Sequence, residues 1–117
     1  MPSYRVAVDV HAVAPGVAPP DLLPRAEELL ATGHRVEDRS VELVRGQPQI
    51  HLRFLVPGSH DVAEDDEAEA AVRALLRDLS PIADLGHWVL RRGAGGRWRT
   101  VRTGDAREDA REHPVDF

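Results

Sequence analysis

The stretch YRVAVDVHAV, residues 4–13, decides the fold because its side chains alternate between apolar and polar with the period of a β-strand. Positions 6, 8 and 10 are valine, whereas the odd positions include Arg5, Asp9 and His11. A strand with this pattern buries one face against a hydrophobic layer and leaves the other face open. The sequence therefore predicts a one-sided sheet whose uncovered face carries a carboxylate and an imidazole.

Two segments have the apolar spacing of an amphipathic helix. The first spans residues 21–33, with Asp21 placed to cap its start and Gly33 to close its end. The second spans residues 62–79, and its acidic first half and arginines further on suit the helix dipole. The residues at helical spacing are expected in the core: Leu22, Ala26, Leu29, Leu30, Ala68, Ala71, Val72, Leu75, Leu76 and Leu79.

Four further segments have the character of strands. Residues 34–45 alternate imperfectly, which predicts a β-bulge near Asp38–Arg39, and residues 50–56 follow after the short reversal GQPQ. Residues 87–92 and 97–103 flank the glycine-rich reversal GAGG, across which Trp88 and Trp98 are expected to stack.

The resulting element order is β-α-β-β-α-β with one extra strand allowed at the C-terminal end. This order is that of the ferredoxin-like, or split βαβ, arrangement. Short right-handed connections then predict an α+β sandwich with a four-stranded antiparallel sheet, strands one and three in its middle, and both helices on one face. Residues 1–103 are expected to form this single domain, and residues 104–117 a mobile polar tail.

Composition narrows the classes of function. The net charge of −5 disfavours nucleic acid as a partner, although RRGAGGRWRTVR is a basic stretch. The absence of cysteine excludes disulfides, thiolate metal sites and cysteine nucleophiles. No apolar run approaches the roughly 18 residues of a membrane span, and the N-terminus lacks the pattern of a signal peptide. We expect a cytoplasmic protein with no membrane association.

The strand period collects a set of side chains on the uncovered face. If the valines of the first strand face the helices, Asp9 and His11 face away, and the third strand adds His51 and Arg53. If Trp88 and Leu90 point inward, the next strand adds its odd-numbered residues, Arg91 included. The expected face consists of Ala7, Asp9, His11, Val13, His51, Arg53, Leu55, His87 and Val89.

Three interpretations of this face compete. The first is a solvated face on which Asp9 pairs with Arg53. The second is a contact with another protein, most simply a second copy of the chain. The third is a chemical site in which His11 or His51 is an acid/base or a metal ligand, Asp9 orients an imidazole and Arg53 holds an anion.

We therefore expect a small binding or regulatory module, homodimeric through its open sheet face, with an unidentified small-molecule or protein ligand. Its candidate site residues are Asp9, His11, His51 and Arg53, with no metal and no cofactor assigned. The alternative is a small dimeric enzyme that uses a histidine of the sheet face. Fold analogy alone supports that alternative.

Overall fold

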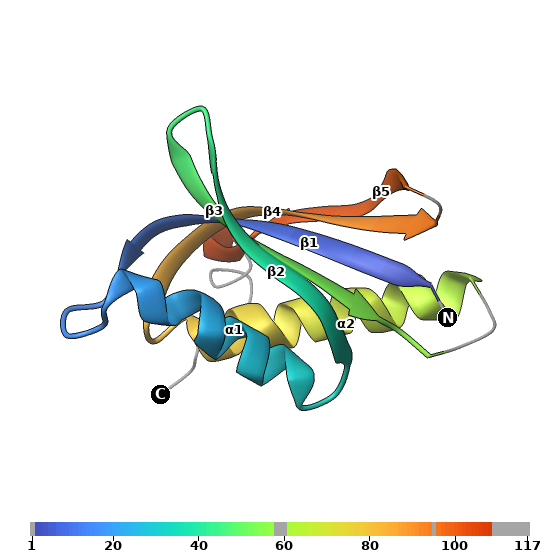
Figure 1. The fold of residues 1–117 in the computed structure, drawn as a ribbon, viewed down its shortest axis with the longest axis horizontal. Helices are drawn as coiled ribbons and strands as arrows, with labels where there is room; N and C mark the ends of the chain where they lie inside the picture. Colours follow the sequence, from blue (N-terminus) through green and yellow to red (C-terminus); the bar gives the residue numbers. More distant parts are fainter. Residues whose placement is uncertain (1, 58–60, 95, 109–117) are drawn as a thin grey trace.

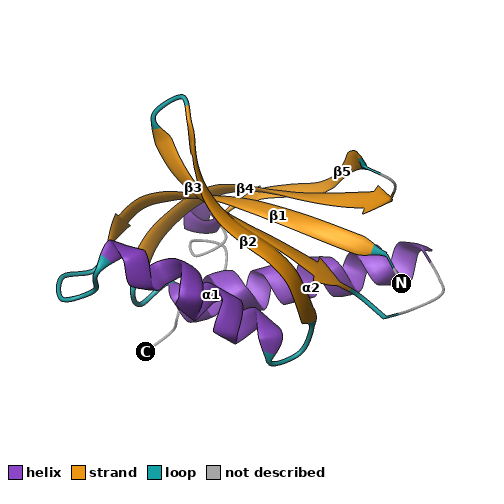
Figure 2. Ribbon diagram, in the orientation of Figure 1, coloured by secondary structure: helices purple, strands orange, loops and turns teal. Residues whose placement is uncertain are grey.

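The computed structural model describes residues 2–57, 61–94 and 96–108, which form an antiparallel sheet with helices on one side (Figures 1 and 2). The elements are β1 (Ser3–Val13), the 3-10 helix η1 (Pro19–Asp21), α1 (Leu22–Ala31), β2 (Arg35–Val44), β3 (Gln47–Leu55), α2 (Asp61–Leu79), β4 (Ala83–Ala94) and β5 (Arg97–Asp105). The strand order is β2-β3-β1-β4-β5. The predicted α+β class is confirmed.

The described residues form a sheet of five strands, whereas the sequence predicted four and allowed one more. The added strand is β5, which forms a hairpin with β4 and pairs along its outer side. β4, with 12 residues, pairs with β1 along one edge and with β5 along the other. β1 is thus the central strand, with β3 and β4 beside it.

The core lies between the sheet and the two α-helices. Tyr4, Val6 and Val8 of β1 are fully buried, and Phe54 of β3 stacks on Tyr4 with ring centroids 6.0 Å apart. The predicted helix positions are buried or, for Leu29 and Ala71, packed against the core from its margin. The even positions of β1 up to Val8 thus face the helices and are buried in the core, as the alternation predicts.

β-Bulges break this alternation at both ends of the sheet. Between β1 and β4 the register shifts around Val10, so that Val13 lies opposite Ala83 and packs against the core. The expectation that Val13 belongs to the open face is wrong, because an extra residue in a strand exchanges the two faces beyond it. The bulge expected near Asp38–Arg39 lies between Val36 and Asp38.

The two tryptophans lie on opposite faces of the sheet, so the expected stack across the hairpin is wrong. Trp88 is fully buried and lies opposite Gly104, while Trp98 lies opposite Gly93 on the uncovered face. Each indole covers its glycine: a Cβ atom built on Gly104 would lie 2.6 Å from Trp88, and one on Gly93 would lie 2.5 Å from Trp98. Only residues without a side chain fit at these two positions.

The first residues of the segment predicted to be a mobile tail belong to the folded domain. Gly104 and Asp105 belong to β5, and Ala106 packs against the core. Arg107 forms an ion pair with Asp84, with an N···O distance of 2.7 Å. The rest of the expected tail, residues 109–117, lies outside the described residues.

The glycine under Trp88 gives a test of this packing. We expect Gly104→Ala to lower the free energy of unfolding by about 1–3 kcal/mol, because the new methyl group overpacks a buried indole. The measurement is urea denaturation followed by tryptophan fluorescence. Gly33→Ala is the control, since its Cβ would meet nothing within 4 Å. Equal stabilities of the two variants would contradict the close approach of Trp88 to Gly104.

Candidate functional site: the open sheet face

Three arginines form a row across the middle of the open sheet face. Arg5 of β1 lies directly opposite Arg53 of β3 on one side and Arg91 of β4 on the other. Residues directly opposite in an antiparallel pair share a face, with Cα atoms about 4.5–5.5 Å apart. Like charges in this arrangement destabilise a sheet, so the row needs compensation from elsewhere.

Trp98 supplies part of that compensation. Its ring lies over Gly93, and the Cζ atom of Arg5 is 4.9 Å from the ring centroid. The Cζ atom of Arg53 is 5.4 Å from the same centroid. The negative face of an indole attracts a guanidinium, so Trp98 holds two of the three arginines in place.

A carboxylate neutralises only one end of this row. The Nε atom of Arg53 is 3.3 Å from Glu37 Oε1, which also accepts a hydrogen bond of 2.9 Å from Ser3 Oγ. Among the described residues, neither Arg5 nor Arg91 has a carboxylate within 4.0 Å. Both are half-buried. The middle of the open face is therefore electropositive.

Asp9 and His51 are joined through a residue that the sequence analysis missed. Gln49 Nε2 donates a hydrogen bond of 2.7 Å to Asp9 Oδ1, which turns its carbonyl oxygen toward His51. His51 Nε2 lies 3.0 Å from Gln49 Oε1 and 3.0 Å from Glu42 Oε2. Because both neighbours are acceptors, the neutral His51 ring carries its proton on Nε2 and leaves Nδ1 as an acceptor.

The surroundings of His51 favour the neutral form of its ring. Burial of the ring lowers its pKa below 6.5, and the charges of Arg5 and Arg91 lower it further. Glu42 opposes this shift, but that carboxylate is half exposed and water screens its charge. At neutral pH the contact between His51 and Glu42 is therefore a hydrogen bond that the uncharged imidazole donates from Nε2 to the carboxylate.

His11 stands apart from the other candidate residues. Its exposed ring lies against Gly86, near the carboxylate of Asp84. Ala7 is the β1 residue opposite His51, and the rise from residue 7 to residue 11 of a strand is about 13 Å. In the described part of the chain, no three His, Cys, Asp or Glu side chains are grouped so that they would hold a metal ion.

The structure thus divides the four predicted site residues. Asp9 and His51 belong to one hydrogen-bonded chain, Arg53 belongs to the arginine row, and His11 is separate. The expected pair between Asp9 and Arg53 does not form, because Asp9 lies opposite Gln49 whereas Arg53 lies opposite Arg5. His87 is exposed and lies opposite Asp105.

Some of the missed residues had a signal in the sequence. Arg5 shares the odd parity of Asp9 in β1, and Gln49 shares that of His51 in β3, so alternation alone places them on the face. Glu42 lies beyond the bulge of β2, and Trp98 depends on the register of the β4–β5 hairpin. Neither position follows from local pattern.

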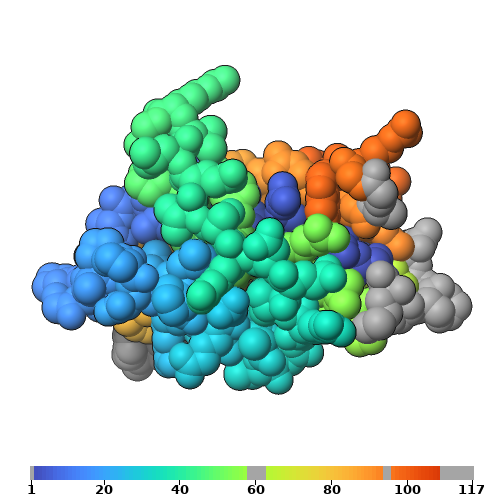
Figure 3. All heavy atoms as spheres, viewed as in Figure 1, coloured from blue at the N-terminus to red at the C-terminus, as the bar shows by residue number. Residues whose placement is uncertain are grey.

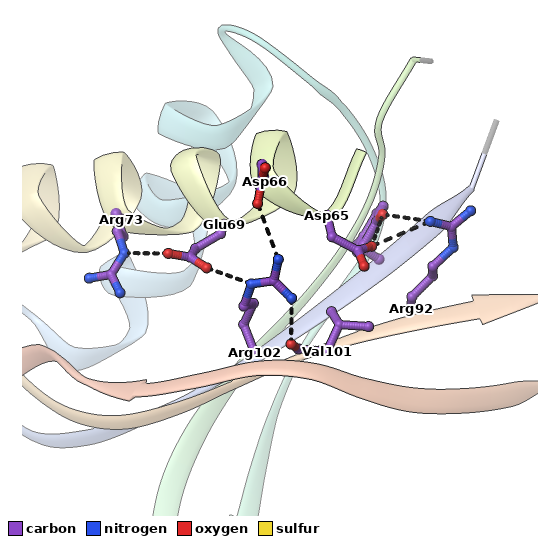
Figure 4. Close-up of polar contacts among 8 residues, drawn as sticks. Asp65, Asp66, Glu69, Arg73, Arg92, Val101 and Arg102 are labelled. Atoms are coloured by element: carbon purple, nitrogen blue, oxygen red, sulfur yellow. Dashed lines mark hydrogen bonds and ion pairs between the residues drawn. The ribbon is translucent and has the colours of Figure 1, made fainter. Parts of the chain in front are cut away.

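A second group of charges lies on the helix side of the sheet, where arginines of the strands face carboxylates of α2 (Figure 4). Tyr4 donates a hydrogen bond of 2.6 Å to Asp65 Oδ1, and burial of the phenol raises its pKa. The guanidinium of Arg92 lies 2.9 Å from Glu64 Oε2 and 3.3 Å from Asp65 Oδ1. These contacts fasten the first half of α2 to β1 and β4.

Arg102 repeats this arrangement on β5. It lies 2.8 Å from Glu69 and 3.1 Å from Asp66, and Glu69 also pairs with Arg73 (Figure 4). The acidic residues of α2 thus serve as anchors between helix and sheet. We assign this group a structural role, and the open face is the candidate functional site.

Comparison with known proteins shows a likeness of fold. No family model matches the sequence, and no curated protein matches it. Among solved structures, a phage SAM lyase in its apo state superposes with a TM-score of 0.54 over 88% of this chain and 87% of that chain. The two are 11% identical in sequence. In the described part of the chain, no helix is long and apolar enough to cross a membrane.

The pKa of His51 tests the electrostatics of this face. Arg5→Gln or Arg91→Gln should raise it, because each removes a nearby positive charge, and Glu42→Gln should lower it further. NMR titration of the imidazole measures the shift. Arg99→Gln is the control: Arg99 is exposed and lies opposite Arg92, on the helix-facing side of the hairpin. An unchanged pKa in Arg5→Gln and Arg91→Gln would contradict this geometry.

The same lowered pKa predicts a dependence of stability on pH. Between the folded pKa of His51 and 6.5 the unfolded chain binds the proton more readily than the folded chain. The contribution of His51 to stability is therefore complete above pH 6.5 and declines as pH falls from 6.5 through the folded pKa. Urea denaturation of wild type and His51→Gln across this range measures it, and parallel pH profiles would contradict it.

Proposed function

We propose that the chain is a small binding module with its open sheet face as the binding surface, and that it works as a homodimer joined through strand β2. The strand order β2-β3-β1-β4, with β5 added at one edge, supports a ferredoxin-like arrangement. In such an arrangement the helices cover one face of the sheet and leave the other accessible. The likeness to the SAM lyase fold is consistent with this architecture.

The observation that carries the dimer is the gathering of exposed apolar side chains on one strand. In the described part of the chain, the large hydrophobic residues that are exposed are Val41, Leu43 and Val44, at 57%, 73% and 43%. They lie in the arm, which we define as residues 41–49 at the far end of the β2–β3 hairpin. The arm projects from the body, away from the helices (Figures 1 and 3).

β2 is also an edge strand, because within the sheet it pairs with β3 alone. Its outer side presents backbone donors and acceptors that suit pairing with another strand. Both edges carry exposed charges, Arg97 and Arg99 on the opposite edge, β5, and five charged residues on β2, but the exposed large apolar side chains of the described residues all lie on β2. The two edges of the sheet therefore differ, and β2 is the one suited to a partner.

The sequence of β2 is compatible with pairing to a copy of itself. An antiparallel two-fold register centred on Val41 sets Leu43 of one copy beside Arg39 of the other, and Glu42 beside Ser40. No like charges are opposed in that register. Stacking the two open faces on each other would instead bring the two arginine rows together, which disfavours the face itself as the dimer contact.

A second candidate function is an enzyme that uses a histidine of the sheet face. The protonation state and the fixed orientation of the His51 ring favour it. The ring is neutral at neutral pH and fixed by Gln49 and Glu42, with Nδ1 able to accept a proton. A hollow of about 390 Å³ is lined by other residues, none of them histidine: Val17, Asp21, Pro24, Arg25, Glu28 and Ile82. The binding module is the function that the geometry supports best, because the arginine row of the open face gives a charged ligand a surface to bind.

Light scattering after size exclusion tests the dimer. The wild type should elute with about twice the chain mass of 12.9 kDa. Val41→Asp should give the monomer mass, because the new carboxylates of the two copies would face each other across the two-fold axis and repel. Thr103→Asp, on the exposed part of β5, is the matched control and should remain dimeric.

Two results would contradict this contact. One is a monomeric wild type at about 100 µM, well above the Kd of a stable dimer. The other is dissociation by Val89→Asp but not by Val41→Asp, since Val89 lies on the open face opposite Ala7.

A further inference from the structure

We propose that Arg5 and Arg91, with Arg53 at one end of the row, bind a phosphoryl oxyanion on the open sheet face. This inference rests on the proposed function in one respect: it takes the open face as the binding surface. It adds the chemical class of the ligand and the residues that hold it.

Two half-buried arginines of the open face lack a counter-charge among the described residues. Five arginines in the described part of the chain are half-buried: Arg5, Arg53, Arg91, Arg92 and Arg102. Three of them have carboxylate partners within 4.0 Å, as Arg92 has in Glu64 and Asp65. Among the described residues, no carboxylate lies within 4.0 Å of Arg5 or Arg91. Since they face each other across β1 and β4, their repulsion is a cost that the fold alone does not remove.

The spacing of the strands suits a phosphoryl group. Neighbouring strands are about 4.8 Å apart, so two guanidinium groups on adjacent strands can reach the same phosphoryl group. A guanidinium binds two oxygens of such a group at once, and Arg5 is already held over Trp98 before any ligand arrives. Thr100, opposite Arg91 on β5, adds a hydroxyl donor at the edge of the row.

The charges around the arginine row favour a small ligand over a nucleic acid. Acidic side chains flank the row on the side of β2 and β3: Glu37 contacts Arg53, and Glu42 contacts His51. A nucleic acid strand laid across the sheet would meet these carboxylates, and the net charge of −5 repels a polyanion as a whole. A small phosphorylated molecule fits between them, over Arg5 and Arg91.

Isothermal titration with inorganic phosphate and pyrophosphate, at pH 7.5 and low salt, tests the site. The wild type should bind at least one of them with a Kd below about 1 mM. Arg5→Gln and Arg91→Gln should each weaken binding about tenfold or more, because each removes a guanidinium that donates two charge-assisted hydrogen bonds to the anion. Arg99→Gln removes the same charge from the helix-facing side of the hairpin and should change the Kd less than about twofold.

Two further readouts separate binding from a structural effect. Bound phosphate should raise the pKa of His51 in the wild type and leave it unmoved in Arg91→Gln, measured by NMR titration. Without ligand, Arg91→Gln should melt at the same temperature as the wild type or higher, because it relieves repulsion. A lower melting temperature together with an unchanged Kd would show that Arg91 serves the fold, and would overturn the proposal.

The oligomeric state of the same samples separates this inference from the proposed dimer. A dimer that binds neither phosphate nor pyrophosphate overturns the oxyanion site and leaves the dimer standing. A monomer that binds phosphate with the expected loss in Arg91→Gln supports the site and overturns the dimer. Equal affinities of wild type, Arg5→Gln and Arg91→Gln would show adventitious binding and overturn the site.

Discussion

The alternation of side chains along β1 is the constraint on which the rest of the structure depends. β1 is the central strand and pairs with both β3 and β4, so its register fixes the faces of its two neighbours. This one strand contributes Tyr4, Val6 and Val8 to the core, and Arg5 and Asp9 to the polar face. A slip by one residue would exchange the two sets completely.

Parity along single strands was predictable, whereas the positions of bulges and hairpin registers were not. The buried set of β1 and β3 and the helical core positions followed from local period, and most of them are buried as expected. Val13 changed faces at a bulge, and Trp98 lies on the face opposite to Trp88 because of the pairing of β4 with β5. Such features depend on which residues of two paired segments meet, and no local pattern in one segment encodes that choice.

The two faces of the sheet treat the same residue type differently, as Arg91 and Arg92 show. They are neighbours in β4 and point to opposite faces. Arg92 meets carboxylates of α2, a helix whose acidic first half matches the arginines beneath it. Arg91 lies on the face opposite the helices, and among the described residues its row is balanced by the indole of Trp98 and by Glu37 at one end. The covered face thus carries its own counter-ions, and the uncovered face leaves charge available to a ligand.

The contacts between indoles and glycines have a consequence for how this chain can diverge. At each of two places an indole occupies the volume that a side chain on the neighbouring strand would need: Trp88 over Gly104, and Trp98 over Gly93. A bulkier amino acid at either glycine position is compatible with the fold only where the facing tryptophan has been replaced by something smaller. Each pair is therefore a size-coupled unit, in which descendants of this sequence should gain a side chain at the glycine only together with, or after, the loss of the indole.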